Sequence, residues 1–470
     1  MTKVKTADFY KNKSFWLENC QDNLTPRPSL EESKVVDIAI MGAGFTGLWT
    51  AYYLIRQNPS LNIVILEKEI TGYGASGRNG GWCYPVFSVT PSTLLERYGK
   101  SMARELQLAM FDSVTEIGNV IEKENIQCDW TIGGGLKVSL GQQGIPSLEN
   151  ELLTYKKMGI DAHYQLLNKS QLEKRVRIQG AERGIYTKHS AVLNPAKLAR
   201  QLANVLEGYG VKIYEQTEVQ KIKEGTSRKG SRLITQSGSV TANIASVIAG
   251  EAYVSQLKEF QRKVIPMYSL ITLTEPLTKQ QWSEIGWESR ESIGSTRYSI
   301  NYLQRTRDGR ILFGGRGQPY RFGSKIKDSF DVHGPTHKTL QQMLKKWFPS
   351  LNNIGFTHSW GGPVGITRDW TPNFQFNKHS RIANAWGYVG QGVSTTNLAG
   401  RILRDLIYEK ESSLTKLPMV QHQSRNWEME PLRWIGARFV QNGLERVDRK
   451  SEKTGFSPTG NTLAERIGLH

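Results

Sequence analysis

The strongest constraint on the fold is a glycine-rich turn between a predicted strand and a predicted helix near the N-terminus. Residues 34–41 (KVVDIAIM) form an apolar run rich in Val and Ile, which is typical of a central parallel strand. The run leads into residues 42–47 (GAGFTG) and then into a helical apolar pattern, LWTAYYLIRQ. In this setting Gly42 permits a tight turn, Gly44 lets the backbone approach a pyrophosphate, and Gly47 lets the helix pack against the strand. The turn therefore predicts a dinucleotide site at a helix N-terminus.

A second predicted strand, residues 62–66 (NIVIL), supports this interpretation because an acidic residue follows it. Glu67 lies 20 residues beyond Gly47, where the carboxylate that binds a ribose 2′-hydroxyl is expected in such folds. This carboxylate would repel a 2′-phosphate. We therefore expect a Rossmann-type domain that binds an adenosine with a free ribose.

Two further glycine-rich segments favour a flavin over a nicotinamide. Residues 71–82 (TGYGASGRNGGW) are too rich in glycine for a regular element, which suggests that their backbone approaches a ligand closely. Residues 387–392 (GYVGQG) precede a helical pattern at residues 393–407. A helix N-terminus behind this loop can stabilise the negative charge that a reduced flavin carries near N1 and the C2 carbonyl.

Taken together, these segments resemble the FAD-dependent amine and amino acid oxidoreductases of the D-amino acid oxidase superfamily. The likeness spans residues 14–448, and within the superfamily the chain is most similar to the gamma-glutamylputrescine oxidoreductase group. The matching segments are VDIAIMGAGFTGLWTAYYL, VILEKEITGYGASGRNGGW, VIAGEAY, ILFGGRG, WGGPVGITRDWTPN, GYVGQGVSTTNLAGR and WEMEPLRWIGAR. The resemblance implies an α/β (α+β) fold with a discontinuous Rossmann-type FAD-binding domain and an antiparallel-sheet substrate domain.

The expected cofactor is noncovalent FAD. Some relatives attach the flavin through a His in the segment that matches residues 76–81, or through a Cys near the C-terminal loop. Here Asn79 stands close to that His position, and no cysteine follows Cys128. The expected cofactor-binding residues are Gly42, Gly44, Phe45, Thr46, Gly47, Glu67, Lys68, Gly74, Ala75, Ser76, Arg78, Asn79, Gly80, Gly81, Val219, Gly250, Gly362, Gly387, Gly390, Gly392, Val393 and Ser394.

The domains are expected to interleave along the chain. The alternation in YSLITLTEPL and RILFGG is typical of an antiparallel sheet and indicates the substrate domain. The expected division is an N-terminal extension (1–29), an FAD-binding domain (30–90, 191–257 and 351–410), a substrate domain (91–190 and 258–350) and a C-terminal helical tail (411–470).

The tail carries an apolar stripe at roughly helical spacing: Leu432, Ile435, Phe439, Leu444 and Val447. Arginines occupy other positions of the same segment. Such a helix either packs on its own domain or lies on a membrane surface. The sequence leaves both interpretations open.

The resemblance implies oxidation of an amine, in which hydride passes from the carbon beside nitrogen to flavin N5. This chemistry needs a neutral, well-positioned amine and few catalytic side chains. The candidates for positioning are Trp82, Tyr268, Tyr302 and Gln391, although Trp82 and Tyr268 are equally typical of ordinary packing. Gln391 replaces a His that is common in the superfamily, which puts an acid/base role there in doubt.

The charge suggests an anionic substrate. The chain has 61 Lys+Arg against 43 Asp+Glu, a net charge of +18. A solvated surface, an acidic substrate, nucleic acid and a membrane are all compatible with this field. Arg305 and Arg316 are the candidates for binding a substrate anion, because guanidinium groups bind multi-oxygen anions through parallel hydrogen bonds.

The expected reaction converts a primary or secondary amine to an imine, which hydrolyses to an aldehyde or keto acid. The favoured substrate is an amine with a distal anion, similar to gamma-glutamylputrescine, and oxygen or another acceptor reoxidises the flavin. Small amino acids, N-methyl amino acids and aminoalkylphosphonates are alternatives. A tRNA-modifying flavoprotein is an alternative of another class, but no RNA-binding module is visible in the sequence.

The remaining features predict a cytoplasmic protein without a metal. The three cysteines form no disulfide framework, and residues 1–20 lack the apolar core of a signal peptide. The longest apolar stretch, residues 35–55, is interrupted by Asp37 and by glycines, so no membrane span is expected. The eight His residues show no metal-ligand spacing.

Overall fold

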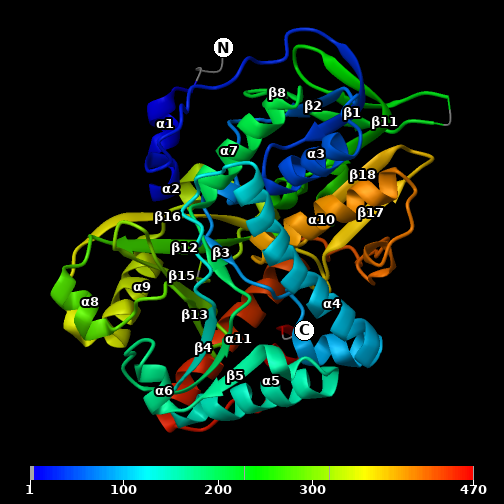
Figure 1. Cartoon of the computed structure of the whole chain (residues 1–470). Helices are drawn as coiled ribbons and strands as arrows, with labels where there is room; N and C mark the ends of the chain where they lie inside the picture. Colours follow the sequence, from blue (N-terminus) through cyan, green and yellow to red (C-terminus); the bar gives the residue numbers. More distant parts are fainter. Residues whose placement is uncertain (1–4, 227, 317, 469–470) are drawn as a thin grey trace.

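Two eight-stranded sheets organise the chain, and they occupy different parts of the molecule in Figure 1. The structure, a computed structural model, describes residues 5–226, 228–316 and 318–468, and only the backbone of Arg316 is described. The expected mixture of a dinucleotide-binding sheet and a second, mainly antiparallel sheet is confirmed.

The first sheet contains the glycine-rich turn. Its strands are β1 (Lys34–Met41), β2 (Ile63–Leu66), β8 (Lys212–Tyr214), β9 (Lys221–Lys223), β10 (Ser231–Ile234), β11 (Ser239–Ile248), β17 (Asn373–Asn377) and β18 (Ile382–Trp386). Strands β18, β11, β1, β2 and β8 lie side by side and pair in parallel. Their apolar runs are buried on both faces, as expected for a parallel sheet covered by helices.

Four helices pack around this sheet: α3 (Phe45–Gln57), α4 (Pro91–Lys123), α7 (Pro195–Gly208) and α10 (Gly392–Ile407). Helices α3 and α10 lie against each other (Figure 1). Their close approach requires Gly400, because a Cβ there would lie 2.8 Å from the backbone of Trp49. This contact places the N-termini of α3 and α10, both preceded by glycine-rich loops, in one region of the molecule.

The second sheet is mainly antiparallel. Its strands are β4 (Gly135–Leu140), β5 (Tyr164–Leu167), β6 (Ala181–Thr187), β12 (Ile265–Thr274), β13 (Ser292–Ser295), β14 (Asn301–Arg305), β15 (Ile311–Arg316) and β16 (Phe356–Ile366). All neighbouring pairs are antiparallel except β4 and β13, which run in parallel. Helices α5 (Ile145–Met158), α6 (Lys169–Glu173), α8 (Lys279–Ile285) and α9 (Gly334–Trp347) accompany this part of the chain.

The expected domain division differs from the structure at two places. Helix α4 falls within the segment 91–190 that we expected in the substrate domain, but its apolar face packs in the core around the first sheet. Residues 356–366 fall within the segment 351–410 that we expected in the FAD-binding domain, but as β16 they pair with β12 in the second sheet. The sequence WGGPVG marks a buried strand without indicating which sheet it joins. We propose that the boundary lies after Ile366, and the rest of the division remains a proposal.

Both ends of the chain pack on this framework. Helices α1 (Ala7–Lys11) and α2 (Phe15–Glu18) bury Tyr10, Phe15 and Trp16 in a cluster with Ile271 and Trp360 of the second sheet. Helices α11 (Leu432–Thr454) and α12 (Leu463–Gly468) complete the tail. Figure 1 shows α11 running along the region of the second sheet.

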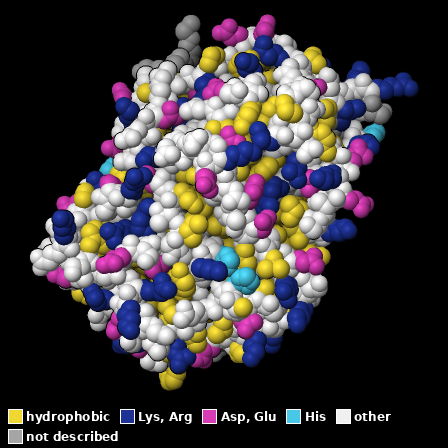
Figure 2. Space-filling model, viewed as in Figure 1, with side chains coloured by type: hydrophobic (Ala, Val, Ile, Leu, Met, Phe, Trp, Pro, Cys, Tyr) yellow, Lys and Arg dark blue, Asp and Glu magenta, His cyan; other side chains and the backbone are white. Residues whose placement is uncertain are grey.

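The surface charge is dispersed. Figure 2 shows Lys and Arg side chains spread over the visible face, interspersed with acidic side chains. Within the described residues, no helix is long and apolar enough to cross a membrane. The same part of the chain contains no group of three or more side chains able to hold a metal ion.

Candidate active site

The glycine-rich turn has the geometry of a phosphate cradle. Gly42 adopts φ +104°, and a Cβ at Gly47 would lie 2.0 Å from the Gly42 carbonyl oxygen. Gly44 is the N-cap of α3 and has no side chain that would fill the space at the helix N-terminus. The first turn of α3 includes Phe45, whose N–H donates to Ser76 Oγ at 2.9 Å. The turn, Phe45 and Ser76 of the second glycine-rich segment therefore lie together.

Glu67 is held against the same turn. Its Oε2 accepts a hydrogen bond from the Ala43 N–H at 2.8 Å, and Oε1 accepts one from the Glu69 N–H at 2.9 Å. Burial raises the pKa of Glu67 to about 7. Gly250 follows Ala249, whose carbonyl oxygen would lie 2.8 Å from a Cβ at Gly42. The carboxyl ends of β1, β2 and β11 thus bring the turn, the acidic residue and Gly250 together, as is usual for ligand sites in parallel sheets.

A cavity of about 100 Å³ lies between the second glycine-rich segment and the second sheet. It collects ten of the predicted site residues: Ala75, Arg78, Asn79, Gly80, Trp82, Tyr302, Gly362, Gly390, Gln391 and Val393. Five lining residues were not predicted: Ser269, Ile300, Pro363, Val364 and Val389. The cavity therefore joins both glycine-rich loops to strands β12, β14 and β16.

An aromatic pair forms one wall of this cavity. The rings of Trp82 and Tyr302 meet edge to face with centroids 5.6 Å apart, and Trp82 Nε1 donates to the Leu303 carbonyl at 2.8 Å. The Tyr302 hydroxyl lies 2.9 Å from Ser269 Oγ. Gly80 is required here, because a Cβ would lie 2.5 Å from the Tyr302 ring. These contacts hold both rings in fixed positions.

Two predicted site residues, Tyr268 and Arg305, are not brought to the cavity. Side chains alternate between the faces of a strand, so Tyr302 and Arg305 of β14 point to opposite faces. Arg305 lies over the Trp282 ring at 3.9 Å and donates to the Trp287 carbonyl. On β12 the Tyr268 hydroxyl instead interacts with the backbone of Lys327. Ser269, the next residue, lines the cavity.

Arg78 was predicted to bind the cofactor, yet its guanidinium is already engaged with the protein. It donates to Asp331 Oδ2 at 2.5 Å, to the Tyr253 hydroxyl at 2.8 Å and, through Nε, to the Tyr73 carbonyl at 2.8 Å. Burial raises the pKa of Asp331 to about 6. Arg78 thus lines the cavity, and the Asp331 carboxylate neutralises its charge.

The other predicted cofactor residues fall into three groups. Lys68 is exposed and pairs with Glu218 at 2.7 Å, and Ser394 Oγ donates to the Tyr84 carbonyl at 2.6 Å, so both side chains have protein partners. Val219 is buried in the core of the first sheet. The rest lie in the glycine-rich turns or at helix N-termini: Thr46, Gly74, Gly81, Gly387 and Gly392.

Sequence reasoning missed Glu251, a buried carboxylate that connects the two halves of the site. Its Oε1 accepts from the Gly365 N–H at 3.0 Å, and its Oε2 accepts from the Gly387 N–H at 2.9 Å. Burial raises its pKa to about 7. Glu251 therefore fixes the C-terminal glycine-rich loop to the end of β16. An acidic residue directly after Gly250 was the available signal.

We expect Glu251→Gln to weaken FAD retention about tenfold, because an amide has one acceptor oxygen and cannot serve both N–H groups. The measurement is the ratio of 450 nm to 280 nm absorbance after dilution and filtration. Glu409→Gln, a change at an exposed residue that pairs with Lys378, is the control. Equal FAD retention by the two variants would contradict this role of Glu251.

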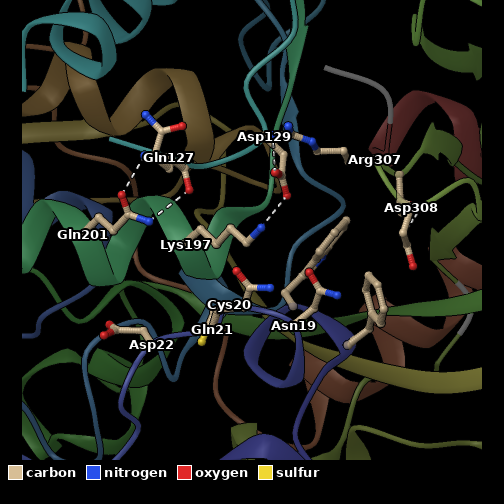
Figure 3. Close-up of a pocket in the computed structure, with 13 residues that line it drawn as sticks. Asn19, Cys20, Gln21, Asp22, Gln127, Asp129, Lys197, Gln201, Arg307 and Asp308 are labelled. Atoms are coloured by element: carbon tan, nitrogen blue, oxygen red, sulfur yellow. Dashed lines mark hydrogen bonds and ion pairs between the residues drawn. The ribbon is translucent and has the colours of Figure 1, made fainter. Parts of the chain in front are cut away.

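A larger pocket of about 580 Å³, shown in Figure 3, shares no lining residue with this cavity. Several of its polar side chains bind one another. Lys197 and Arg307 pair with Asp129 at 2.9 and 3.2 Å, and Gln127 and Gln201 exchange hydrogen bonds. None of the predicted catalytic residues lines it. The smaller cavity is therefore the candidate active site.

The fold and the site define a dinucleotide-dependent oxidoreductase with a two-walled active site. A sequence profile described as "FAD dependent oxidoreductase" matches residues 37–406. The chain belongs to this DAO family, and its cofactor is FAD.

Curated relatives and solved structures agree with this assignment. The chain is 28% identical over 384 residues to gamma-glutamylputrescine oxidoreductase of Escherichia coli K12, covering 81% of this chain and 86% of the relative. It is 28% identical over 395 residues to the probable oxidoreductase OrdL of Haemophilus influenzae, covering 83% and 86%. The glycine oxidase structure from Geobacillus kaustophilus matches the fold with a TM-score of 0.69 at 20% identity, covering 83% of this chain and all of that chain.

The residues present fit FAD. The N-cap of α10 is Gln391, whose side chain makes no capping hydrogen bond, so the helix N-terminus is open, as in α3. Gly42, Gly44 and Gly47 would hold the pyrophosphate, and the Glu67 carboxylate would accept a hydrogen bond from the ribose hydroxyl group. Gly80 and Gly390, which line the same cavity as the aromatic wall, would hold the flavin.

Proposed function

We propose that the protein oxidises the C–N bond of a primary or secondary amine to an imine, which hydrolyses to an aldehyde or keto acid. The observation that carries this proposal is the cavity shared by both glycine-rich loops and the Trp82–Tyr302 pair. FAD, when bound, supplies the hydride acceptor. The names of the relatives support an amine or amino acid substrate.

The lining of the cavity favours an uncharged amine. Among the described residues that line it, Arg78 alone carries a full charge, and Asp331 neutralises that charge. An ammonium group would therefore lose its hydration without gaining an ionic partner, which is costly. The amine gives its proton to solvent water before or during entry, and Trp82 and Tyr302 hold its carbon in position.

The proposed substrate carries an anion distant from the amine, as gamma-glutamylputrescine does. Arg305 does not line the cavity, so Arg316 is the remaining candidate for the anion. Its backbone is paired with Ser269, a lining residue. Small amino acids, N-methyl amino acids and aminoalkylphosphonates are the alternatives, and a role in tRNA modification is the alternative of another class.

We expect Arg316→Met to raise KM for the anionic amine more than tenfold and to change KM for an uncharged amine analogue much less. Loss of one charged contact typically costs about 2–5 kcal/mol. Arg305→Met is the matched control, because Arg305 packs on Trp282 at the other face of β14. If the two variants have the same KM for the anionic amine, Arg316 does not bind the anion.

A panel of amines tests the function itself. Each amine is mixed anaerobically with the purified protein, and loss of absorbance near 450 nm, about where oxidised flavins absorb, reports oxidation. We expect amines with a distal carboxylate to bleach the flavin fastest. A panel that leaves the flavin oxidised would exclude amine oxidation. Readmission of air then shows whether oxygen is the acceptor.

We propose that FAD is held without a covalent bond. Asn79 occupies the segment where some relatives carry a linking His, and its side chain bonds only to the local backbone: Ala75, Ser76 and Gly81. The three cysteines are buried and free. Free cysteines support the proposal of a reducing, cytoplasmic location.

Contact between the tail and a membrane also remains a proposal. The apolar stripe divides in the structure: Leu432, Ile435 and Phe439 are 67%, 52% and 47% exposed, whereas Leu444 and Val447 are partly covered. The exposed half supports a peripheral contact, and the covered half supports packing on the protein.

A further inference from the structure

Helix α11 lies outside the family match, which ends at residue 406, yet it contacts the segments that form the candidate active site. The first contact is at its C-terminal half. Asp448 is 4% exposed, and its carboxylate accepts hydrogen bonds from the Tyr298 N–H at 3.0 Å, the Ser299 N–H at 2.7 Å and Ser299 Oγ at 2.5 Å. Arg297 pairs with Asp448 and Glu452 of the same helix.

These bonds determine where Ile300 stands. Residues 296–300 connect β13 to β14, and Ile300 lines the cavity. Tyr302, two residues further on, belongs to the aromatic wall. A segment without regular structure has no ladder of hydrogen bonds to hold it, so the Asp448 carboxylate supplies partners for two of its backbone N–H groups.

The second contact is at the start of the helix. Trp427, just before α11, donates from Nε1 to the Ile366 carbonyl at 2.8 Å, and Trp427 and Ala437 pack against a cluster that contains Val389. Val364 belongs to the same cluster, and both valines line the cavity. The helix therefore supports the cavity from two sides.

We propose that α11 builds two walls of the substrate site and that Asp448 is a positioning residue, which sets the size of the site through Ile300. The element that supports the substrate site thus lies C-terminal to the part of the chain that the family profile matches. The identity of the ligand in this site rests on the proposed function. The positioning of Ile300 by Asp448 does not depend on that function.

The test uses the holoenzyme of the whole chain, four single variants and the double variants described below. Asp448→Ala removes the carboxylate, Asp448→Asn keeps one acceptor oxygen, and Ile300→Ala shortens the wall directly. Glu445→Gln is the matched control, because Glu445 is an exposed residue of α11 that pairs only with Arg449. FAD content and the unfolding temperature of each variant report whether the fold is retained.

Two readouts then separate positioning from general stability. The first is quenching of flavin fluorescence by iodide, which reports how open the cavity is and needs no substrate. The second is KM against kcat for the amine that bleaches the flavin fastest. We expect Asp448→Ala to increase iodide quenching and to raise KM about fivefold with kcat nearly unchanged. Asp448→Asn is expected to be intermediate.

The double variant Asp448→Ala/Ile300→Ala is expected to match Ile300→Ala alone, because Asp448 acts through the Ile300 side chain and has nothing to position once that side chain is removed. The proposal is overturned if Asp448→Ala quenches like Glu445→Gln, or if the double variant shows the sum of both effects. Should Asp448→Ala fail to fold, Asp448→Asn and its double variant with Ile300→Ala decide in the same way. If no amine bleaches the flavin, the proposed function fails while the iodide result still decides the role of Asp448.

Discussion

Gly47→Ala is expected to purify without FAD. The added Cβ would lie 2.0 Å from the Gly42 carbonyl oxygen and 3.1 Å from Ile40 Cγ2. The backbone oxygen cannot move aside without opening the turn that presents the helix N-terminus to the pyrophosphate. We expect the absorbance bands near 375 and 450 nm, about where bound flavins absorb, to be lost.

The same substitution elsewhere provides the control. Gly436→Ala lies in α11, where a Cβ would meet nothing within 4 Å, and it is expected to leave FAD content unchanged. Gly44→Val tests the phosphate site without distorting the turn. A Cβ at Gly44 would meet the movable Ser76 side chain at 3.0 Å, so the backbone of the turn can stay in place. The larger Val side chain would still fill the space that the phosphates need. Normal FAD content in both Gly47→Ala and Gly44→Val would show that the pyrophosphate binds elsewhere.

Arg78→Met is expected to lower stability by about 3–5 kcal/mol, because it leaves the buried Asp331 carboxylate without its ionic partner. Arg78 also donates to the Tyr73 carbonyl and the Tyr253 hydroxyl, so the segments at 71–82, 251–256 and 328–331 all lose a shared contact. The measurement is the denaturant midpoint of the holoenzyme, together with its FAD content.

The effect of Arg78→Met should depend on pH. The pKa of Asp331 is about 6 in the folded protein, above its ordinary value, so the folded state holds a proton that the unfolded state has released. Stability therefore falls as pH rises from about 4 to 6. Without Arg78 the pKa of Asp331 rises further and this loss continues to higher pH. The variant's deficit should be smallest near pH 4 and largest near pH 8.

Arg78→Met/Asp331→Asn removes both charges and is expected to recover part of the lost stability, with little remaining pH dependence in this range. A double variant as unstable as Arg78→Met at every pH would mean that Arg78 stabilises through packing over Tyr73 rather than through Asp331.

The sequence by itself determined the cofactor-binding half of the protein. A Val- and Ile-rich strand, the turn at residues 42–47 and the helix that follows it appear in the structure as β1 and α3, with Glu67 at the end of β2. Such local patterns are readable because the glycine positions, the strand and the helix lie next to each other in the chain. The glycine-rich segments at 71–82 and 387–392 were readable for the same reason.

Only the tertiary structure decided the substrate half. Tyr268 and Ser269 are neighbours in one strand, so their side chains point to opposite faces and only one of them can face the cavity. In a sheet that is buried on both faces, no alternation of polar and apolar residues shows which of the two it is. The role of Glu251 depends on N–H groups more than 100 residues away in the chain. The hydrogen bonds from the Tyr298 and Ser299 N–H groups to Asp448 likewise join segments about 150 residues apart, and long-range contacts of this kind leave no local pattern in the sequence.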